Sequence, residues 1–345
     1  MITEIYKIDR DKIDKDKINK ASKFIKKGEL VAFPTETVYG LGANGLDEKA
    51  CKKIFEAKKR PADNPLILHI SNKNEIYELV EDIPKEAFDV MDKLWPGPMT
   101  LIFKKSDIVP KIVTAGGDTV AVRMPVDKIA LEFIRQCNYP IAAPSANLSG
   151  KPSPTNAKDV LFDMDGRISA IIDGGESDIG IESTVIDFSQ KPFTILRPGF
   201  YTFEFLKNYI EDLRLDDSLV DDNAIPKSPG QKYKHYAPKA KMEVYVGEMA
   251  SEKIMERAIF FTNNNKKVGI LEFEDKIAKF KKYVNLSFGD RNNLVEMSHN
   301  LFSFLRIMDE KNVDVILAEG VDDKNLGKSI MNRMKKSASG NIFKL

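Results

Sequence analysis

The stretch FPTETVYGLGANGLDEKACKKIFEAKKRPADN, residues 33–64, says more about fold and function than any other part of the chain. It begins with hydroxyl side chains around one carboxylate, Glu36, continues through three glycines, and ends on the basic run 58–60. Flexible glycines, hydroxyl donors and guanidinium groups close in sequence are what a polyphosphate-binding site needs. A glycine turn followed by a solvated amphipathic helix explains the same residues without a ligand. This stretch alone leaves both interpretations open.

The sequence on either side predicts a mixed α/β domain. Residues 11–27 have apolar side chains at helical spacing and predict a helix that ends at Gly28. Leu30–Phe33 is typical of a buried strand, the glycines after it of a turn, and Asp47 of a helix N-cap. Further strands are expected at Leu66–Ile70, Met99–Phe103, Thr119–Arg123, Ile168–Ile172 and Ser183–Phe188, with helices at 47–59, 127–136 and 155–163. Because strands outnumber helices, we expect an open, twisted, mixed sheet with helices packed against it.

The composition changes after this domain. Residues 211–223 hold six acidic residues against one arginine and predict an exposed, mobile stretch. The next segment, 226–238, reads PKSPGQKYKHYAP, and its two tyrosines and histidine are more than a plain spacer needs. Beyond it, strands are expected at 242–247, 267–272, 282–287 and 313–318, with a clear helix at 290–311. This alternation predicts a small parallel α/β domain of doubly wound type.

Composition argues against several classes of protein. The chain has 345 residues, enough for roughly two domains, and its formal net charge of +1 argues against strong global attraction to nucleic acid or anionic membrane. Its two cysteines, Cys51 and Cys137, lack CxxC spacing and fit a reducing compartment. No apolar run approaches the roughly 18 residues of a membrane span, and the charged N-terminus is unlike a signal peptide. We therefore expect a cytoplasmic protein with no membrane partner.

Two glycine motifs do not meet the requirements of the sites they suggest. Gly40, Gly42 and Gly45 satisfy G-x-G-x-x-G, but the third glycine of a dinucleotide site lies inside the helix, and here the helix is expected to start after it. The triplet Gly327-Lys328-Ser329 resembles the end of a phosphate loop, but the position that needs the first glycine is Asp322. The three histidines are isolated, and GxSxG is absent. Neither a protein metal site nor a hydrolase site is expected.

Short polar segments interrupt the predicted strands at their ends. They are WPGPMT (95–100), TAGGDTVAVRMP (114–125), APSANLSGKPSPT (143–155), GIESTVID (180–187) and LRPG (196–199). Open α/β sheets bind ligands at strand ends, and these segments supply small hydroxyls and isolated arginines without an activated nucleophile. Such an inventory suits a reaction governed by positioning and charge neutralisation, for example nucleotidyl transfer.

In their order and spacing these segments, with FPTETVYGLGANG and the Lys58–His69 run, resemble the threonylcarbamoyl-AMP synthase family, whose fold is YrdC-like. The segment SPGQKYKHYAP resembles the linker of the family's two-domain form, with Gln231 where the family often has Met. The resemblance implies three parts: a YrdC-like catalytic domain over 1–210, a linker or lid over 211–238, and a smaller C-terminal Rossmann-like domain over 239–345.

The reaction implied by this resemblance has three substrates. Bicarbonate and L-threonine form a carbamate, which attacks the α-phosphate of ATP to give L-threonylcarbamoyladenylate and pyrophosphate, with Mg²⁺. The product feeds the threonylcarbamoyladenosine modification of tRNA next to the anticodon, which a separate threonylcarbamoyl transferase completes. The resemblance therefore implies a nucleotidyltransferase, and no acid–base residue is assigned.

The family motifs, carried over position by position, imply two sets of binding residues. The threonine set is Thr37, His69, Arg123, Ala143 and Ser183. The ATP set is Lys58, Arg60, Asn64, Thr119, Ser145, Asn147, Ser153, Arg197 and Tyr233. Arginines at 60 and 197 suit this role because a guanidinium can bridge phosphate oxygens bidentately. A lone His69 without the family motif would more often be a satisfied core residue.

The main alternative is an RNA-binding module without nucleotide chemistry of its own. YrdC-like domains offer a basic concave face, and residues 49–60 hold six Lys/Arg that could contact tRNA or double-stranded RNA phosphates. Glu48 and Glu56 dilute this patch, and no RNP-type aromatic motif is present. Carbamoyl-phosphate-linked chemistry, as in YrdC-like domains of maturation proteins, is a third possibility. It is disfavoured because the accompanying zinc-finger and acylphosphatase-like segments are absent.

Overall fold

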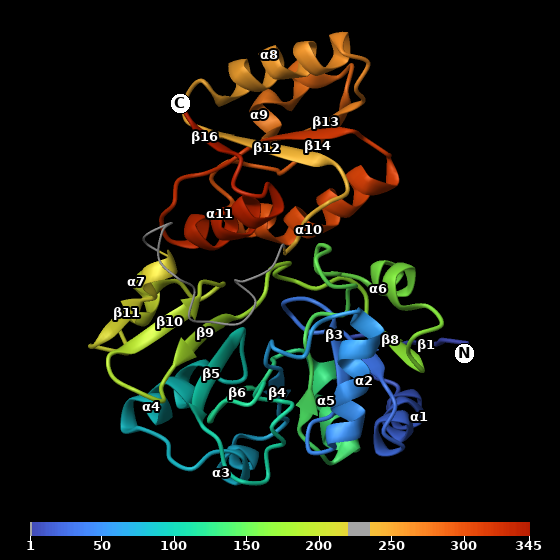
Figure 1. The fold of residues 1–345 in the computed structure, drawn as a ribbon, viewed down its shortest axis with the longest axis vertical. Helices are drawn as coiled ribbons and strands as arrows, with labels where there is room; N and C mark the ends of the chain where they lie inside the picture. The colour runs from blue at the N-terminus through green and yellow to red at the C-terminus, as the bar shows by residue number, and fades with distance from the viewer. Residues whose placement is uncertain (1, 220–234) are drawn as a thin grey trace. The chain divides into compact units, whose positions relative to one another are not determined.

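A computed structural model describes residues 2–219 and 235–345, which form two compact units (Figure 1). The first unit contains the described residues up to Leu219, except for 150–152 and 179–181. The second unit contains residues 235–345 and those two short segments. Most of the predicted linker, with Tyr233, lies outside the described residues. The predicted domain boundaries and the lid therefore stay predictions.

One mixed sheet runs through the described part of the first unit, with strand order β1-β8-β2-β3-β7-β4-β6-β5-β9-β10-β11. Some neighbours are antiparallel, such as β2 with β3, and others parallel, such as β4 with β6. The predicted open, mixed sheet is confirmed. The strands are β1 (Glu4–Lys7), β2 (Val31–Phe33), β3 (Gly40–Asn44), β4 (Ile67–His69), β5 (Met99–Lys104), β6 (Thr119–Arg123), β7 (Ile141–Ala142), β8 (Ala170–Asp173), β9 (Thr184–Asp187), β10 (Phe193–Arg197) and β11 (Leu213–Leu215).

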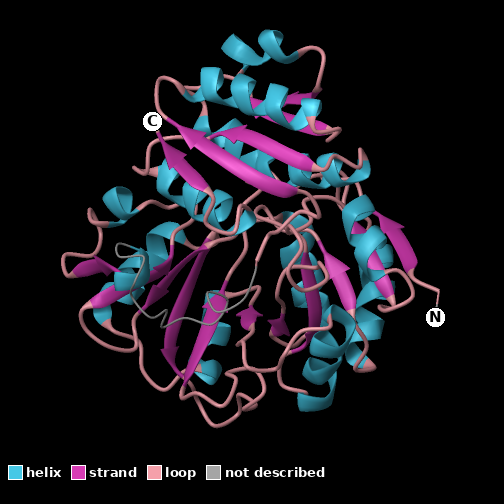
Figure 2. Ribbon diagram, turned by 45° about the horizontal axis from the view of Figure 1, so that its top comes forward, coloured by secondary structure: helices cyan, strands magenta, loops and turns pink. Residues whose placement is uncertain are grey.

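Helices pack on both faces of this sheet (Figure 2). Successive strand residues point to opposite faces, and in β2 Ala32 enters one apolar cluster while Val31 and Phe33 enter the other. Helices α1 and α5 pack on the Phe33 side. The helices of the first unit are α1 (Lys15–Lys26), α2 (Glu48–Lys58), α3 (Ile76–Leu79), α4 (Lys85–Leu94), α5 (Lys128–Cys137), α6 (Ala157–Met164) and α7 (Phe203–Leu206).

The prediction of a glycine turn after residue 33 is wrong for Gly40 and Gly42, which lie in strand β3 and pair with β2, whereas Gly45 lies in the turn before α2. A Cβ on Gly42 would lie 2.8 Å from Ile141 Cγ2 and 3.1 Å from the Phe33 ring. Glycine is therefore required for close packing against a large neighbour, a need that a strand glycine commonly marks. The predicted N-cap is confirmed, since the Asp47 side chain accepts hydrogen bonds from the first turn of α2.

The prediction of an exposed, mobile stretch at 211–223 is wrong for residues 213–215. These residues form β11, which pairs in parallel with β10. Leu213 is buried and Leu215 packs against the same core. The two leucines alternate with Arg214 at the period of a strand, a short signal that the surrounding carboxylates obscure.

The second unit contains a five-stranded sheet of order β14-β13-β15-β12-β16, in which every pairing is parallel. Helix α8 lies on one face, and α10 and α11 lie on the other (Figure 1). The predicted doubly wound architecture is confirmed. The elements are β12 (Lys241–Val246), α8 (Ala250–Asn263), β13 (Val268–Glu272), α9 (Glu274–Ile277), β14 (Val284–Ser287), α10 (Leu294–Glu310), β15 (Val315–Glu319), α11 (Leu326–Ser337) and β16 (Ile342–Lys344).

Two buried carboxyl groups meet where the adjacent strands β13 and β15 end. Burial, and then its hydrogen bond to Glu319, raise the pKa of Glu272 to about 9. Burial acts in the same direction on Glu319, but its hydrogen bonds to Glu272 and Arg291 lower its pKa overall. Lys276 lies 3.7 Å from Glu319, and Asp275 lies 3.7 Å from Arg291. A proton on Glu272 leaves one negative charge on the pair. The pair can therefore stay buried beside Lys276 and Arg291.

This shared proton predicts a pH-dependent stability. The folded pKa of Glu272 lies above its unfolded value of 4.5, so its favourable contribution is complete below pH 4.5 and is lost as pH rises toward 9. The Glu272→Gln substitution keeps a donor but removes the titration. We expect its melting temperature, relative to the unsubstituted chain, to rise progressively between pH 5 and pH 9, by up to roughly 1.4 kcal/mol of stability per pH unit.

Differential scanning calorimetry of the full chain at several pH values measures this shift. The matched control is Glu274→Gln, which neutralises an exposed carboxylate two positions along the chain and should show a constant difference. A difference for Glu272→Gln that does not change with pH would contradict the shared proton.

Candidate functional site

The loop between β2 and β3 buries polar side chains. Thr35, Glu36 and Thr37 are each at most 3% exposed. Thr35 Oγ1 donates to the carbonyl of Val38 at 2.6 Å and lies 2.9 Å from Thr37 Oγ1. Threonine hydroxyls commonly stabilise a turn by bonding to their own backbone in this way. The turn fixes Glu36 and Thr37 where β6 ends.

Arg123, the last residue of β6, joins this loop to the sheet. Its Nη1 donates to Thr37 Oγ1 at 2.9 Å, and its Nη2 donates to Glu36 Oε1 at 2.6 Å. Both charged side chains are about 95% buried. Charge-assisted hydrogen bonds of this kind are short and strong. They hold the guanidinium in one orientation.

His69 ends β4 directly beside Arg123 in the parallel pairing of β4 with β6. Its ring packs edge-on to Phe33, with centroids 6.0 Å apart. Burial, and then the charge of Arg123, lower the pKa of His69 to about 3. The imidazole is therefore neutral at physiological pH and can exchange hydrogen bonds with an uncharged hydroxyl.

Ser183 reaches the same place from the segment before β9. Its hydroxyl lies 2.8 Å from that of Thr100, whose strand position is paired with Arg123. Arg197, at the end of β10, donates to Ser183 Oγ at 2.9 Å and to its carbonyl at 3.0 Å. Ala143 follows β7, and its N–H donates to Ile67 in β4. The threonine set thus converges on the ends of β4, β6 and β7 and the start of β9.

Part of the ATP set lies where α2 ends against the 143–155 loop. Lys58 is buried, and its ammonium donates to the carbonyls of Asn147, at 2.6 Å, and Ser145. The Ser145 hydroxyl donates in turn to Asn147 Oδ1. These contacts make Lys58 a support of the loop. Its role at a phosphate stays a prediction.

The remaining described members of the ATP set lie in three places. Arg60 donates to the carbonyl of Asn64 at 3.2 Å, just beyond α2. Thr119 begins β6, at the opposite end of that strand from Arg123. Ser153 donates to Glu182 Oε1 at 2.6 Å. Because Glu182 precedes Ser183, this contact brings part of the ATP set next to the threonine set.

Three residues of the candidate site, Glu36, Thr100 and Glu182, are not among those that the sequence predicts. Glu36 stands inside the most informative stretch, but it has no role among the residues carried over from the family. Thr100 belongs to the WPGPMT segment, and Glu182 to GIESTVID. The sequence signal that could have indicated them is their position in polar segments at the ends of predicted strands. Only the fold shows that they connect residues far apart in sequence.

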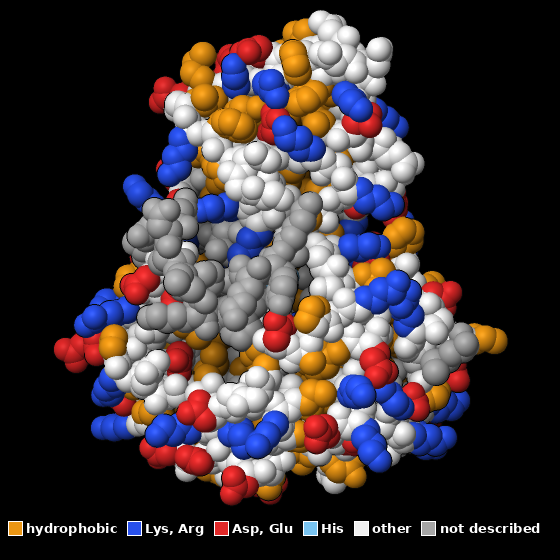
Figure 3. Space-filling model, viewed as in Figure 1, with side chains coloured by type: hydrophobic (Ala, Val, Ile, Leu, Met, Phe, Trp, Pro, Cys, Tyr) orange, Lys and Arg blue, Asp and Glu red, His pale blue; other side chains and the backbone are white. Residues whose placement is uncertain are grey.

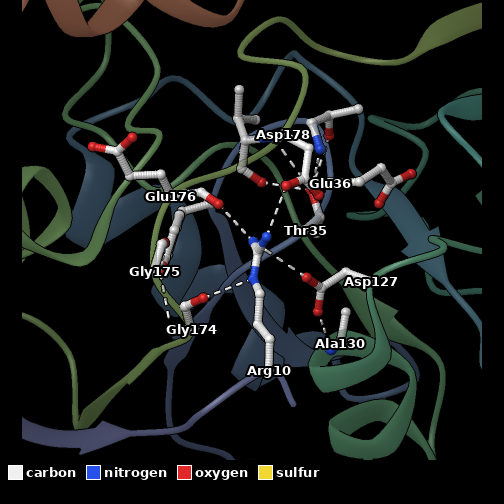
Figure 4. Close-up of polar contacts among 12 residues, drawn as sticks. Arg10, Thr35, Glu36, Asp127, Ala130, Gly174, Gly175, Glu176 and Asp178 are labelled. Atoms are coloured by element: carbon white, nitrogen blue, oxygen red, sulfur yellow. Dashed lines mark hydrogen bonds and ion pairs between the residues drawn. The ribbon is translucent and has the colours of Figure 1, made fainter.

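A second layer of contacts surrounds Arg10 (Figure 4). Its guanidinium donates to the carbonyls of Gly174, at 2.8 Å, and Glu176, at 2.6 Å, and to Asp178 Oδ1, at 2.8 Å. The same group lies 3.5 Å from Asp127, which caps α5. Burial, and to a lesser degree the charge of Glu36, raise the pKa of Asp127, whereas Arg10 opposes the shift. Arg10 therefore ties the segment after β8 to the helix next to the site.

The basic face that the RNA-binding alternative needs is weak in the described residues. Lys58 points into the 143–155 loop, and Lys53 pairs with Glu29 at 2.8 Å. On the face drawn in Figure 3, basic side chains are interspersed with acidic ones. A broad basic surface would be needed for strong binding to nucleic acid.

Neither a metal cluster nor a membrane helix occurs in the part of the chain that the structure describes. No group of three or more His, Cys, Asp or Glu residues there is arranged to hold a metal ion. No described helix is long and apolar enough to cross a bilayer. The predicted cytoplasmic location stays a prediction.

Comparisons with known proteins cover both units. A family model described as "Telomere recombination" matches residues 23–199, and one described as "Threonylcarbamoyl-AMP synthase, C-terminal domain" matches residues 201–339. The threonylcarbamoyl-AMP synthase of Pyrococcus abyssi is 49% identical over 94% of this chain and 95% of its own length. That of Bacillus subtilis is 44% identical over 94% of each.

Solved structures agree with these relatives. A crystal structure of P. abyssi Sua5 complexed with L-threonine has a TM-score of 0.91 and 47% identity, covering 99% of this chain and 100% of that one. Escherichia coli YciO, at 23% identity and a TM-score of 0.53, covers 57% of this chain and 96% of its own and shares the fold alone. The predicted family resemblance and the two-domain form are confirmed.

The Arg10 contacts predict a structural cost that a surface arginine does not carry. Replacing Arg10 with Ala removes three hydrogen bonds and leaves the buried Asp127 without its cation. We expect the free energy of unfolding to fall by about 1–3 kcal/mol. Urea denaturation measures this, with Arg135→Ala as control, because Arg135 only pairs with Glu132 on the surface. Equal losses for the two variants would contradict a special role for Arg10.

Proposed function

Because the chain belongs to the threonylcarbamoyl-AMP synthase family, a family of nucleotidyltransferases, we propose that it makes L-threonylcarbamoyladenylate and pyrophosphate from ATP, L-threonine and bicarbonate. The observation that carries the proposal at the level of residues is the buried cluster of Arg123 and neutral His69, at two strand ends, with Thr37 from the β2–β3 loop. A fixed cation beside neutral hydrogen-bonding groups suits an amino acid that carries a hydroxyl.

L-Threonine is assigned to this cluster. The Arg123 guanidinium, already oriented by two hydrogen bonds, would hold the substrate carboxylate. A neutral His69 would exchange a hydrogen bond with the substrate hydroxyl, which a protonated imidazole could only donate to. Ser183 and the backbone at Ala143 would close the site. A substrate without the hydroxyl would lose its hydrogen bond to His69, so this arrangement would favour threonine over an apolar analogue.

ATP is assigned to the residues beside this cluster. Arg60 and Arg197 would hold phosphate oxygens, and the serines at 145 and 153 would donate to them. A carbamate oxygen attacks the α-phosphorus, the bond from that phosphorus to the bridging oxygen breaks, and pyrophosphate leaves. Arg197 already contacts Ser183, so this arginine would border both substrates. Holding the reacting atoms in line and neutralising phosphate charge is most of what such a transfer requires.

Mg²⁺ is assigned to the nucleotide. The described residues offer no dedicated cluster of metal ligands, and Mg²⁺ in nucleotide sites is commonly held by substrate phosphates and water with one or two carboxylates. The product would go to a threonylcarbamoyl transferase for the modification of tRNA adenosine next to the anticodon, in the cytoplasm.

The reaction is tested by measuring pyrophosphate release from ATP while L-threonine and bicarbonate are omitted in turn. We expect release only when both are present. Release that needs neither would contradict the proposal, and tRNA binding without any release would favour the RNA-binding alternative.

Arg60→Ala tests the phosphate assignment. Loss of a guanidinium that holds a phosphate should lower turnover by roughly 100-fold, because an aligned donor to developing charge is lost. Lys49→Ala, which removes an exposed cation from the first turn of the same helix, should leave turnover unchanged. Turnover of Arg60→Ala equal to that of the control would exclude Arg60 from the phosphate site.

A further inference from the structure

In the buried ion pair of Glu36 and Arg123, each side chain has one polar atom without a hydrogen-bond partner. Glu36 Oε1 accepts from Arg123 Nη2, and Arg123 Nη1 donates to Thr37. In contrast, Glu36 Oε2 and Arg123 Nε are buried without any hydrogen-bond partner. Buried polar atoms are nearly always paired, because leaving one unpaired costs the full desolvation penalty. A charged acceptor and a charged donor left over on the same ion pair indicate a ligand with both signs of charge.

Among the described residues, Glu36 forms an ion pair with Arg123 alone, while the nearby Arg10 is engaged with Asp127 and Asp178. The other groups that feel the charge of Glu36 are Asp127 and Tyr201, and Glu36 raises the pKa of each, after the larger effect of burial. The carbonyl of Tyr201 accepts a hydrogen bond from Thr184 at 2.8 Å, next to Ser183. Glu36 therefore lies at the threonine set, with carboxylates and hydroxyls around it and a single positive partner.

We propose that Glu36 binds the amino nitrogen of L-threonine while Arg123 binds the carboxylate of the same molecule. This rests on the proposed function, which makes L-threonine a substrate. An α-amino acid carries its ammonium and carboxylate on one carbon, so the two charges lie close together, as do those of Glu36 and Arg123. The described part of the threonine set contains a cation and neutral groups but no anion, and Glu36 supplies the missing charge.

This role makes Glu36 a specificity-determining residue. The nitrogen is the atom that becomes part of the carbamate, so the group that holds it also sets its direction in the site. A carboxylate that is left unpaired when no ammonium arrives disfavours hydroxy acids of the same shape. The site would select an amino acid through charge and threonine through its hydroxyl.

The test compares two ligands that differ only at this nitrogen. L-Threonine and (R)-3-hydroxybutanoate share the carboxylate, hydroxyl and methyl groups. Isothermal titration calorimetry of the full chain gives the affinity for each. Because a hydrogen bond to a charged group is involved, we expect the unsubstituted chain to bind L-threonine at least roughly 10-fold more tightly.

In Glu36→Gln, we expect the affinity for L-threonine to fall by roughly 10–100-fold and that for 3-hydroxybutanoate by less than about 3-fold. In the pyrophosphate assay, the KM for L-threonine should rise while the KM for ATP stays unchanged. Glu36→Asp should recover part of the discrimination, because it keeps the charge. Glu29→Gln, which neutralises a surface carboxylate paired with Lys53, is the matched control and should behave as the unsubstituted chain does.

The outcomes separate this inference from the function beneath it. If Glu36→Gln weakens both ligands equally, Glu36 acts only by orienting Arg123 and the inference is overturned. If the unsubstituted chain binds both ligands equally, the inference is overturned. This comparison needs no variant, so it can be made even if Glu36→Gln does not fold. If the unsubstituted chain does not bind L-threonine at all, the proposed function falls as well.

Discussion

The buried ion pair between Glu36 and Arg123 is the interaction on which the rest of the site depends. Placing two charges out of water is costly, and removing one partner of such a pair typically costs about 3–5 kcal/mol. The pair joins the β2–β3 loop to the end of β6, two segments that are far apart in sequence. It therefore fixes the β2–β3 loop against β6, and the register of the sheet then places His69 and Thr100 on either side of Arg123.

A chain of polar contacts begins on the strand next to this pair, where Thr100 of β5 is paired with Arg123 through the backbone. Thr100 carries it to Ser183, which receives two hydrogen bonds from Arg197. The neighbouring Glu182 accepts from Ser153. Residues assigned to the amino acid and residues assigned to the nucleotide thus share hydrogen bonds. The two substrates must be aligned for the reaction. A shared network favours this alignment, because a shift of the threonine set also shifts the ATP set.

Much of the fold could be predicted from the sequence because its strands and helices carry strong local patterns. β6 was predicted with its observed bounds, the Asp47 cap of α2 was predicted correctly, and the helix expected at 290–311 contains α10. The glycines of β3 were misinterpreted because close packing and chain reversal both demand a missing side chain. β11 was missed because two leucines at strand spacing are a weak signal in an acidic segment.

The site was predictable as a set of residues but not as a network. The family motifs imply that Arg123 and Thr37 both contact threonine. The sequence does not show that the two side chains also hydrogen-bond to each other. Lys58 was expected at a phosphate, whereas its burial against backbone carbonyls is a tertiary fact that one basic run cannot reveal. Glu36 has no binding role among the residues that the family motifs imply. Its meaning depends on which of its oxygens has a partner, and only coordinates show that.

The most direct test is a crystal structure of this chain with L-threonine bound. We expect the substrate carboxylate on the Arg123 guanidinium and the substrate nitrogen within hydrogen-bonding distance, about 3 Å, of Glu36 Oε2. L-Threonine bound elsewhere, or bound with its nitrogen turned away from Glu36, would contradict the ion pair as the centre of the site.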